Sequence, residues 1–213
     1  MAFPLRVSME QEKSLRALQE LFAEACNHLS PIVRANRCWN RVALHHLAYR
    51  QLRQRFPQLG SQMACNAIYS VCRAARIVYQ HPQSPWNVTR NPAGELPLLR
   101  FLPRSPVYFD RHTLSLKGDS LSLFTLDGRM HFCLDISPEI HHRFRNGRLR
   151  EISLMRDDRG YVLHFHFRED CDLMGKSGAL PAAGMPGDLP EYLIVQDSRG
   201  KVSVPRAVLS NID

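Results

Sequence analysis

The hydrophobic pattern of this chain changes its period near the middle. Before about residue 80, apolar residues recur every three or four positions, which is typical of amphipathic helices. After residue 106 they alternate, which is typical of half-buried strands. The change falls across a proline-rich segment, residues 81–106, where a connection is expected. We therefore predict an α+β chain with a helical part and a β part.

Three helices are predicted in the first part. They cover residues 10–28, 31–56 and 61–79. The second is expected to begin at Ser30-Pro31, because a cap residue followed by proline is a favoured helix start. At 100° per residue, Arg34, Arg37 and Arg41 fall on one stripe of that helix, beside its apolar face.

Short alternating segments separated by turn residues predict an antiparallel β domain after the prolines. The predicted strands cover residues 107–109, 113–116, 120–126, 130–134, 149–156 and 161–167, with a first strand in 2–8 and a last pair at 192–196 and 201–204. Asp127-Gly128 joins two of these segments and is a strong hairpin signal. The spacing predicts a small antiparallel barrel or sandwich.

The helical part lacks carboxylates over a long stretch, because no Asp or Glu lies between Glu24 and Glu95. Its arginines are Arg34, Arg37, Arg41, Arg50, Arg53, Arg55, Arg73, Arg76 and Arg90. An ordinary exposed helix mixes charge signs, since opposite charges four residues apart stabilise it. The imbalance predicts a polyanionic partner, above all nucleic acid, because each arginine set against a phosphate releases a counterion. The alternative is a basic solvated face that favours solubility.

The composition is that of a basic globular protein. The chain has 213 residues, 44% of them hydrophobic, and a net charge of +8. No apolar run approaches the roughly 20 residues that span a bilayer. The first residues lack the apolar core of a signal peptide, so we expect a cytoplasmic protein with no membrane partner. The six cysteines form no CxxC pair, so we expect buried reduced thiols, with no metal site and no cofactor.

Four segments of the chain carry a resemblance to a known family. They are LHHLAYRQLRQRF (Leu44–Phe56), FPQLGSQMACNAI (Phe56–Ile68), SPVYFDRHTLSLKGDSLSLFTLDGR (Ser105–Arg129) and GRLREISLMRDDRGYVLHFHF (Gly147–Phe167). In this order they resemble the TnpB family of transposon-encoded RNA-guided nucleases, which are related to the type V CRISPR effectors. The four segments extend over most of the chain.

The resemblance implies an α+β architecture in which a helical recognition domain is inserted into a small antiparallel β-barrel of the wedge, or OB-like, type. The implied parts are a first barrel strand (1–9), the helical recognition domain (10–82), a proline-rich connector (83–104), the barrel (105–170), a flexible linker (171–190) and a C-terminal strand pair (191–213). The strand pair is a candidate remnant of the RuvC nuclease domain that follows in the family.

The resemblance also implies a role for the helices, since in the family they help to hold the guide RNA and to read a short motif beside the DNA target. By position, Tyr49, Arg53, Gln62 and Asn66 match the motif-reading group. Their residue types suit it, because Asn and Gln pair with adenine and Arg with guanine. The alternative for Gln62 and Asn66 is capping or a solvated polar surface. The predicted nucleic-acid-binding residues are Arg34, Arg37, Arg41, Tyr49, Arg50, Arg53, Arg55, Gln62, Asn66, Tyr69, Arg73, Arg76, Arg143, Arg145 and Arg148.

The chain departs from the family at the nuclease domain. A RuvC domain needs several carboxylates to hold two metal ions. Here Asp197 alone follows the corresponding strand, and its context, Ser198-Arg199-Gly200, is that of a turn. We therefore predict that this chain by itself has no catalytic residues, is not an enzyme and does not cut DNA.

Two smaller clusters have alternative interpretations. HHRFRNGRLR (His141–Arg150) combines basic residues with Phe144, which suits an RNA backbone and a stacked base, or else a basic loop. Its arginines are Arg143, Arg145, Arg148 and Arg150. His164 and His166 alternate along one strand and share a face. Without a third ligand nearby, a polar strand face is favoured over a metal site.

The main hypothesis is therefore a nuclease-lacking, TnpB-like RNA-binding protein. It would hold a structured guide RNA and recognise double-stranded target DNA without cleaving it. It would act alone, as a homodimer, or with a partner protein that supplies nuclease or effector activity. One alternative is half of a split RNA-guided nuclease whose RuvC part is a separate chain. Another is an RNA-binding scaffold subunit of a CRISPR-type complex.

Overall fold

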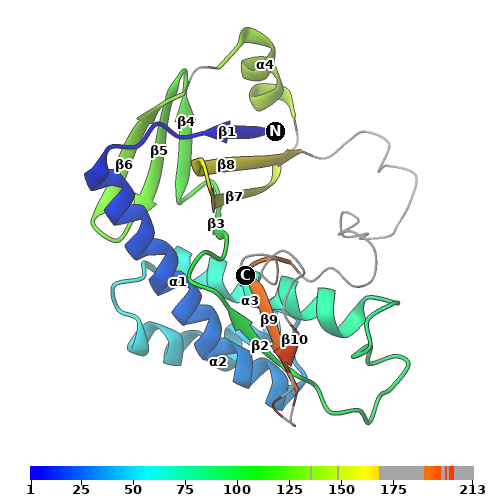
Figure 1. The fold of residues 1–213 in the computed structure, drawn as a ribbon. Helices are drawn as coiled ribbons and strands as arrows, with labels where there is room; N and C mark the ends of the chain where they lie inside the picture. Colours follow the sequence, from blue (N-terminus) through cyan, green and yellow to red (C-terminus); the bar gives the residue numbers. More distant parts are fainter. Residues whose placement is uncertain (135, 148, 168–189, 198–199, 201, 204–213) are drawn as a thin grey trace. The chain divides into compact units, whose positions relative to one another are not determined.

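The computed structural model describes residues 1–134, 136–147, 149–167, 190–197, 200 and 202–203. The chain divides into two compact units, which we call the β unit (Met1–Gln19 and Pro106–Leu180) and the helical unit (Glu20–Ser105 and Pro181–Asp213). Helix α1 (Met9–Asn36) begins in the first and ends in the second (Figure 1). The predicted α+β class and the antiparallel strand pairing are confirmed.

The β unit contains two antiparallel sheets. Its strands are β1 (Ala2–Pro4), β3 (Val107–Phe109), β4 (Leu114–Lys117), β5 (Ser120–Thr125), β6 (Gly128–Cys133), β7 (Leu149–Asp157) and β8 (Gly160–Phe167). They are ordered β1-β8-β7-β3 in one sheet and β4-β5-β6 in the other. Neither sheet is closed into a barrel among the described residues, because each keeps free edges, so of the predicted barrel or sandwich the closed barrel is not confirmed.

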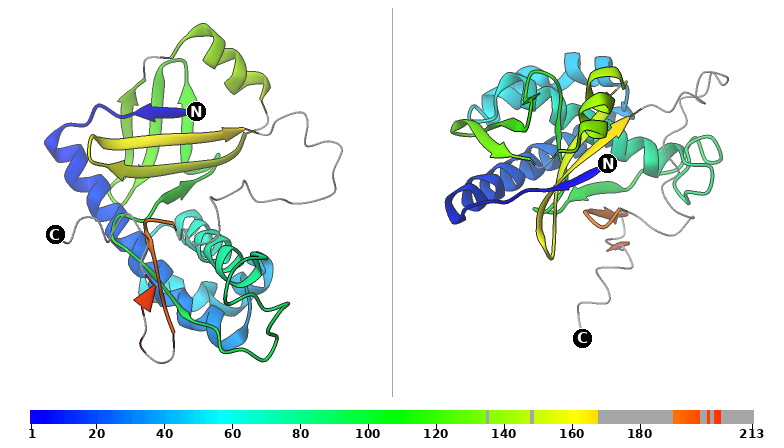
Figure 2. Two further views of the ribbon diagram at one scale, coloured as in Figure 1. Left: turned by 45° about the vertical axis from the view of Figure 1, so that its right-hand side comes forward. Right: turned by 90° about the horizontal axis from the view of Figure 1, so that it is seen from above.

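Strand β1 joins a sheet made otherwise of residues from the second half of the chain. It pairs antiparallel with β8, with Ala2 opposite His164 and Phe3 opposite Leu163 (Figure 2). Phe3 is buried among aromatic rings, which explains why so short a strand is held. The N-terminal turns of α1 are tied to the same unit, since Gln11 donates to the carbonyl of His131 in β6.

The turns of the β unit follow the sequence signals. Thr125 pairs with Gly128, so the hairpin predicted at Asp127-Gly128 is confirmed. Asp157 pairs with Gly160 in the turn between the strands predicted at 149–156 and 161–167. Both glycines have positive φ angles, 108° and 126°, which side-chain-bearing residues rarely adopt.

The helical unit combines the rest of α1 with α2 (Arg41–Arg55), α3 (Ser61–Gln80) and a sheet ordered β10-β9-β2. The strands are β2 (Leu98–Phe101), β9 (Leu193–Gln196) and β10 (Val202–Ser203). Helix α2 packs against α3, and its buried residues Leu44, Ala48 and Leu52 recur every fourth position on one face. Most of α3 is buried, in keeping with its small and apolar residues.

The helix start predicted at Ser30-Pro31 is wrong, because α1 continues through Pro31 to Asn36. The polar side chains in this region bond to strand β2 instead. Asn27 donates to the carbonyl of Phe101 and accepts from its N–H, at 2.9 and 2.7 Å. Ser30 accepts from the N–H of Leu99 at 3.1 Å. Helix α1 thus supplies partners to the edge of β2 that faces away from β9.

The chain between α1 and α2 is a tight link, Arg37–Asn40, that the sequence analysis missed. The N–H of Cys38 bonds the carbonyl of Val33, and Arg37 has a left-handed φ of 46°. This is a Schellman helix end, which usually contains glycine. Asn40 then caps α2 by accepting from the N–H groups of Val42 and Ala43.

The proline-rich segment is more ordered than a simple connector. The buried Asn87 donates to the carbonyls of Gln80 and His81, so it caps the end of α3. Residues 98–101 form β2, which was predicted as connector, and pair with β9 from the C-terminal region. The predicted linker, 171–190, lies outside the described residues except for Pro190.

Candidate nucleic-acid interface

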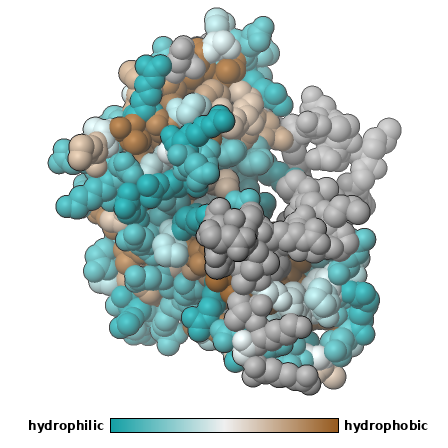
Figure 3. Space-filling view, viewed as in Figure 1, coloured by the Kyte–Doolittle hydropathy of each residue, from teal (hydrophilic) through white to brown (hydrophobic). Residues whose placement is uncertain are grey.

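The carboxylate-free stretch becomes the C-terminal part of α1, helices α2 and α3, and the loop that follows. The outward positions of α2 carry arginine, histidine and glutamine. There is no acidic residue even in the first turn, where a carboxylate would stabilise the helix by interacting with its dipole. Two apolar side chains on this helix, Val42 and Leu47, are also exposed. On the face seen in Figure 3, hydrophilic residues cover most of the described surface.

The predicted stripe of Arg34, Arg37 and Arg41 does not exist, because the link Arg37–Asn40 separates two helices. Arg34 lies in the last turn of α1 and Arg41 in the first turn of α2. The Arg37 guanidinium donates to the carbonyls of Pro92 and Gly94 at 2.7 and 3.1 Å. Arg37 therefore holds the proline-rich loop through two neutral carbonyl groups, which do not compensate its charge.

Other arginines are also fixed by neutral groups. The guanidinium of Arg41 lies 5.7 Å from the centre of the Tyr69 ring, a cation–π contact between α2 and α3. Arg53 donates to the carbonyl of Leu59 in the connection between the same helices. Arg90 donates to the carbonyl of Ser84. None of these contacts cancels the positive charge.

Four further arginines of this stretch also make no ion pair within the described part of the chain. They are Arg34, Arg50, Arg55 and Arg76. Arg50 and Arg55 are exposed on α2, and Arg34 and Arg76 are half-buried. Arg73 on α3 is half-buried and has an interaction partner. The surface therefore combines arginines that are held in place with arginines whose charge is unopposed.

The predicted motif-reading residues are not all accessible. The Tyr49 ring stacks on His45, one turn earlier, with centroids 4.5 Å apart. Arg53 is committed to the Leu59 carbonyl, and Gln62 is half-exposed near the start of α3. Asn66 is only 4% exposed, whereas both a base-reading role and a solvated polar surface need an exposed side chain. Its neighbours Ala64 and Ala67 are also buried, since small side chains let this helix pack closely.

The first part of the second basic cluster, residues 141–146, lies in helix α4 (Pro138–Asn146), and its last two residues, Leu149 and Arg150, begin β7. Ser137 and Pro138 are the start signal that the sequence analysis missed. Phe144 makes ring contacts with three phenylalanines, which explains its position without a stacked base. Arg143 lies over the Phe167 ring at 5.4 Å. The Arg145 side chain and Arg148 lie outside the described part of the structure.

The paired histidines on β8 share a face, as predicted. The rings of His164 and His166 stack with centroids 6.4 Å apart. Burial, then the neighbouring His166 and the N-terminal amine, lowers the pKa of His164 below its usual value of 6.5. Among the described residues, no group of three or more His, Cys, Asp or Glu side chains is placed to hold a metal ion.

The cysteines agree only in part with the prediction of buried thiols. Cys26 and Cys72 are buried, and burial raises the pKa of each thiol to about 12. Cys133 is exposed, so the prediction is wrong for that residue. Cys38 and Cys65 are half-buried. Cys171 lies outside the described residues.

Comparison with known proteins adds no family assignment. No family model matches the chain, and no curated protein matches it either. In the described residues, none of the helices has the length and apolar character to cross a membrane.

Proposed function

We propose that this protein binds structured RNA through its helical unit. The observation that carries the proposal is the surface of arginines without carboxylates, in which Arg34, Arg50, Arg55 and Arg76 have no ion-pair partner in the described residues. Phosphate groups are the ligands that such a surface favours, because each contact neutralises charge and releases a counterion. The exposed glutamines of α2 add neutral hydrogen-bonding groups that suit ribose and base edges.

The resemblance to the TnpB family gives the proposal its finer form. In this form the RNA is a guide, the helical unit is a recognition domain, and the β unit is a wedge-like domain that the chain enters at β1, leaves, and re-enters at β3. The pairing of β1 with β8 supports that order. The complex recognises double-stranded DNA without cleaving it. Tyr49, Arg53 and Gln62 remain candidates for reading the DNA motif, whereas Asn66 is left out because it is buried.

The first test is to purify the tagged protein from its native host and to sequence the nucleic acid that copurifies. We expect one abundant RNA with a constant scaffold and a variable end. The variable end should match a DNA sequence, which can then be tested as a duplex target with and without the RNA. A heterogeneous pool, or no RNA, would contradict the guided form of the proposal.

The second test measures how the affinity for that RNA depends on salt. The double variant Arg50→Gln, Arg55→Gln should reduce the slope of log K against log salt by about 1.4–1.8, since each lost phosphate contact removes about 0.7–0.9. The matched control is Arg111→Gln with Arg159→Gln, two exposed arginines of the β unit. An equal effect of both double variants would mean that net charge alone drives binding.

A further inference from the structure

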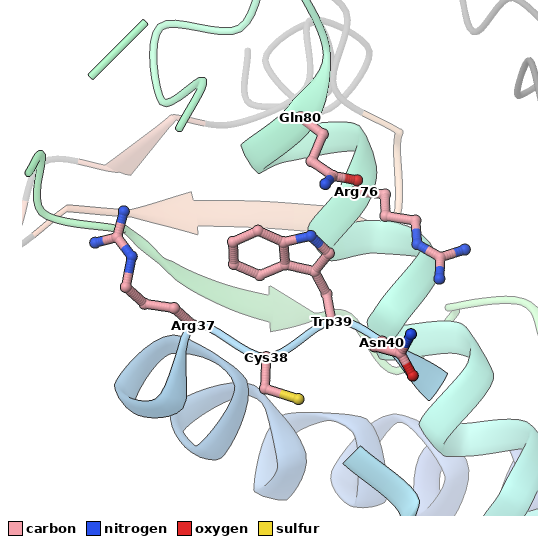
Figure 4. A pocket seen from close by; sticks show the side chains of 6 residues that line it. All are labelled: Arg37, Cys38, Trp39, Asn40, Arg76 and Gln80. Carbon is pink, nitrogen blue, oxygen red and sulfur yellow. The ribbon is translucent and has the colours of Figure 1, made fainter. Parts of the chain in front are cut away.

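A pocket of about 540 Å³ lies in the helical unit, beside the link between α1 and α2. It is lined by Arg37, Cys38, Trp39, Asn40, Arg76 and Gln80 (Figure 4). The first four residues form the link itself, and the last two come from the C-terminal half of α3. The volume falls within the range of about 300–1,000 Å³ that is typical of small-ligand sites.

The indole of Trp39 is a half-exposed aromatic surface in this pocket. In Figure 4 it lies at the centre, with the guanidinium groups of Arg37 and Arg76 on opposite sides in that view. Its ring contacts the buried ring of Tyr79 at 5.4 Å, and the Tyr79 hydroxyl donates to the carbonyl of Pro97. Trp39 is therefore held in position by a side chain that is itself fixed.

The polar groups of the pocket are mainly hydrogen-bond donors. The Asn40 Oδ1 atom already accepts hydrogen bonds from two N–H groups of α2, so the amide NH2 group (Nδ2) is the part of the side chain left to bond a ligand. Arg76 makes no ion pair in the described residues, and Gln80 is exposed. Among the described residues, no carboxylate lines the pocket. The ligand that fits these groups is flat, carries acceptors and has a negative charge.

We propose that this pocket binds one unstacked nucleotide, with its base against the Trp39 indole and its phosphate against Arg76. Bases that are splayed out of a helix are commonly recognised by stacking on aromatic side chains, together with basic groups that follow the backbone. Asn40 and Gln80 are placed to bond the base edge. The source of the nucleotide is the bound RNA, and in that respect the inference rests on the proposed function.

The test uses the fluorescence of Trp39. The chain has two tryptophans, so the variant Trp86→Phe leaves Trp39 as the only indole. The full-length variant is titrated with a single-stranded RNA of eight nucleotides, with AMP and with the copurified RNA, while anisotropy of labelled RNA reports binding independently. We expect saturable quenching of Trp39 by the oligonucleotide, and competition by AMP at higher concentration.

Variants of the pocket separate stacking from general affinity. Trp39→Ala should weaken binding of the oligonucleotide about 10- to 100-fold, the range that corresponds to losing one stacked base. Arg76→Gln keeps the indole and should lower the salt slope by about 0.7. The matched control, Arg111→Gln, changes an exposed arginine of the β unit that does not line the pocket, so it should leave the amplitude of Trp39 quenching unchanged. If Trp39→Ala does not fold, Arg76→Gln carries the test.

The outcomes separate this inference from the proposed function. In one outcome, anisotropy shows RNA binding while Trp39 emission is unchanged and Arg76→Gln keeps full affinity. That result overturns the proposed nucleotide site and leaves the proposal of RNA binding intact. Quenching by AMP without any RNA binding overturns the proposed function and the RNA as source of the nucleotide. Absence of both signals overturns both. Quenching of Trp39 by RNA, together with weaker quenching in Arg76→Gln, supports both the nucleotide site and the proposed function.

Discussion

Within the described residues the two units differ in their ion pairs, although arginines of the β unit such as Arg129 and Arg143 also contact neutral groups. In the β unit, Glu12 pairs with both Arg16 and Arg156 at 2.9 and 3.0 Å, and His141 lies 3.0 Å from Asp119. In the helical unit, arginines donate to backbone carbonyls or lie over an aromatic ring. A carboxylate cancels the charge that it holds, whereas a carbonyl or a ring fixes the guanidinium and leaves its charge in place.

The difference shows how a rigid surface can stay positively charged. A guanidinium held by a carbonyl loses conformational freedom during folding and not during binding, which favours affinity for an anion. Neutral side chains connect the elements of the same unit. Asn27 bonds β2 to α1, Asn87 caps α3, and Asn40 caps α2. Four predictions test this contrast.

The largest effect is expected for Asn27→Ala. The substitution removes two hydrogen bonds to the backbone of Phe101 and leaves a partly buried N–H and carbonyl without partners, at a cost of about 2–4 kcal/mol. Urea denaturation followed by tryptophan emission measures this, because Trp39 and Trp86 both belong to the helical unit. Asn36→Ala in the same helix is the control, since Asn36 is exposed. Equal effects of the two substitutions would show that the bonds to β2 contribute nothing.

This joint illustrates what the sequence can predict and what it cannot. The strands of the β unit follow from local alternation and from glycines such as Gly128 and Gly160, so their order along the chain was predicted well. The end of α1 was not predicted correctly, because the backbone groups that bond Asn27 and Ser30 lie about 70 residues later in the sequence, in β2. Local rules place a helix start at Ser30-Pro31, whereas the tertiary contact keeps the helix continuous.

The candidate interface was predictable in composition and not in geometry. The absence of carboxylates identifies the helical part as basic without any structure. The composition does not show which arginines donate hydrogen bonds to backbone carbonyls, as Arg37 and Arg53 do. Their partner carbonyls lie in loops of irregular conformation. The helix predicted over residues 31–56 contains Trp39. Only the break at Arg37–Asn40 moves it into a pocket, and the local signal for that break is the capping residue Asn40.

A smaller effect is expected from pH in the helical unit. Burial and the nearby Arg55 lower the pKa of His28, whose Nε2 atom has no hydrogen-bond partner among the described residues. Its folded pKa therefore lies below its unfolded value, and the unfolded chain binds the proton more readily. The free energy of unfolding should fall as pH drops below about 6.5. Tryptophan-detected urea midpoints at pH 8.0 and 5.5 measure the change.

His28→Gln removes this titration, so the difference between the two midpoints should shrink. The control is His164→Gln, which changes a histidine of the β unit with a pKa lowered in the same direction. It should leave the tryptophan-detected pH dependence unchanged. The same pH dependence in wild type and in His28→Gln would contradict the assignment.

A weaker effect is expected for the ion pairs of the β unit. Glu12→Gln removes two exposed pairs, with Arg16 and Arg156, and should lower stability by about 0.5–1 kcal/mol. Hydrogen exchange of amides in β7 and β8 measures it, since the β unit has no tryptophan. Glu10→Gln, in the same first turn, is the control. In 1 M salt the difference between the variants should vanish, because screening acts on exposed charges.

The smallest change in stability is expected from adding a carboxylate to α2, and it tests the contrast directly. In Gln51→Glu the new carboxylate lies four residues before Arg55, and both positions are exposed. A Glu placed four residues before a basic residue stabilises a helix by about 0.3–0.5 kcal/mol. The helical unit should therefore become slightly more stable in urea, while affinity for RNA falls because the charge of Arg55 is now shared.

The control for this substitution is Gln58→Glu, which makes the same change in net charge at an exposed turn between α2 and α3. It offers no partner at helical spacing and should not stabilise the unit. If Gln51→Glu weakens RNA binding more than Gln58→Glu does, the positive charge of α2 is used for binding. The helix then gives up the stability of an ion pair at this position in order to bind RNA. If the two substitutions weaken RNA binding equally, the outer face of α2 is not the interface. The arginines of α3 are then the next candidates for contacting RNA.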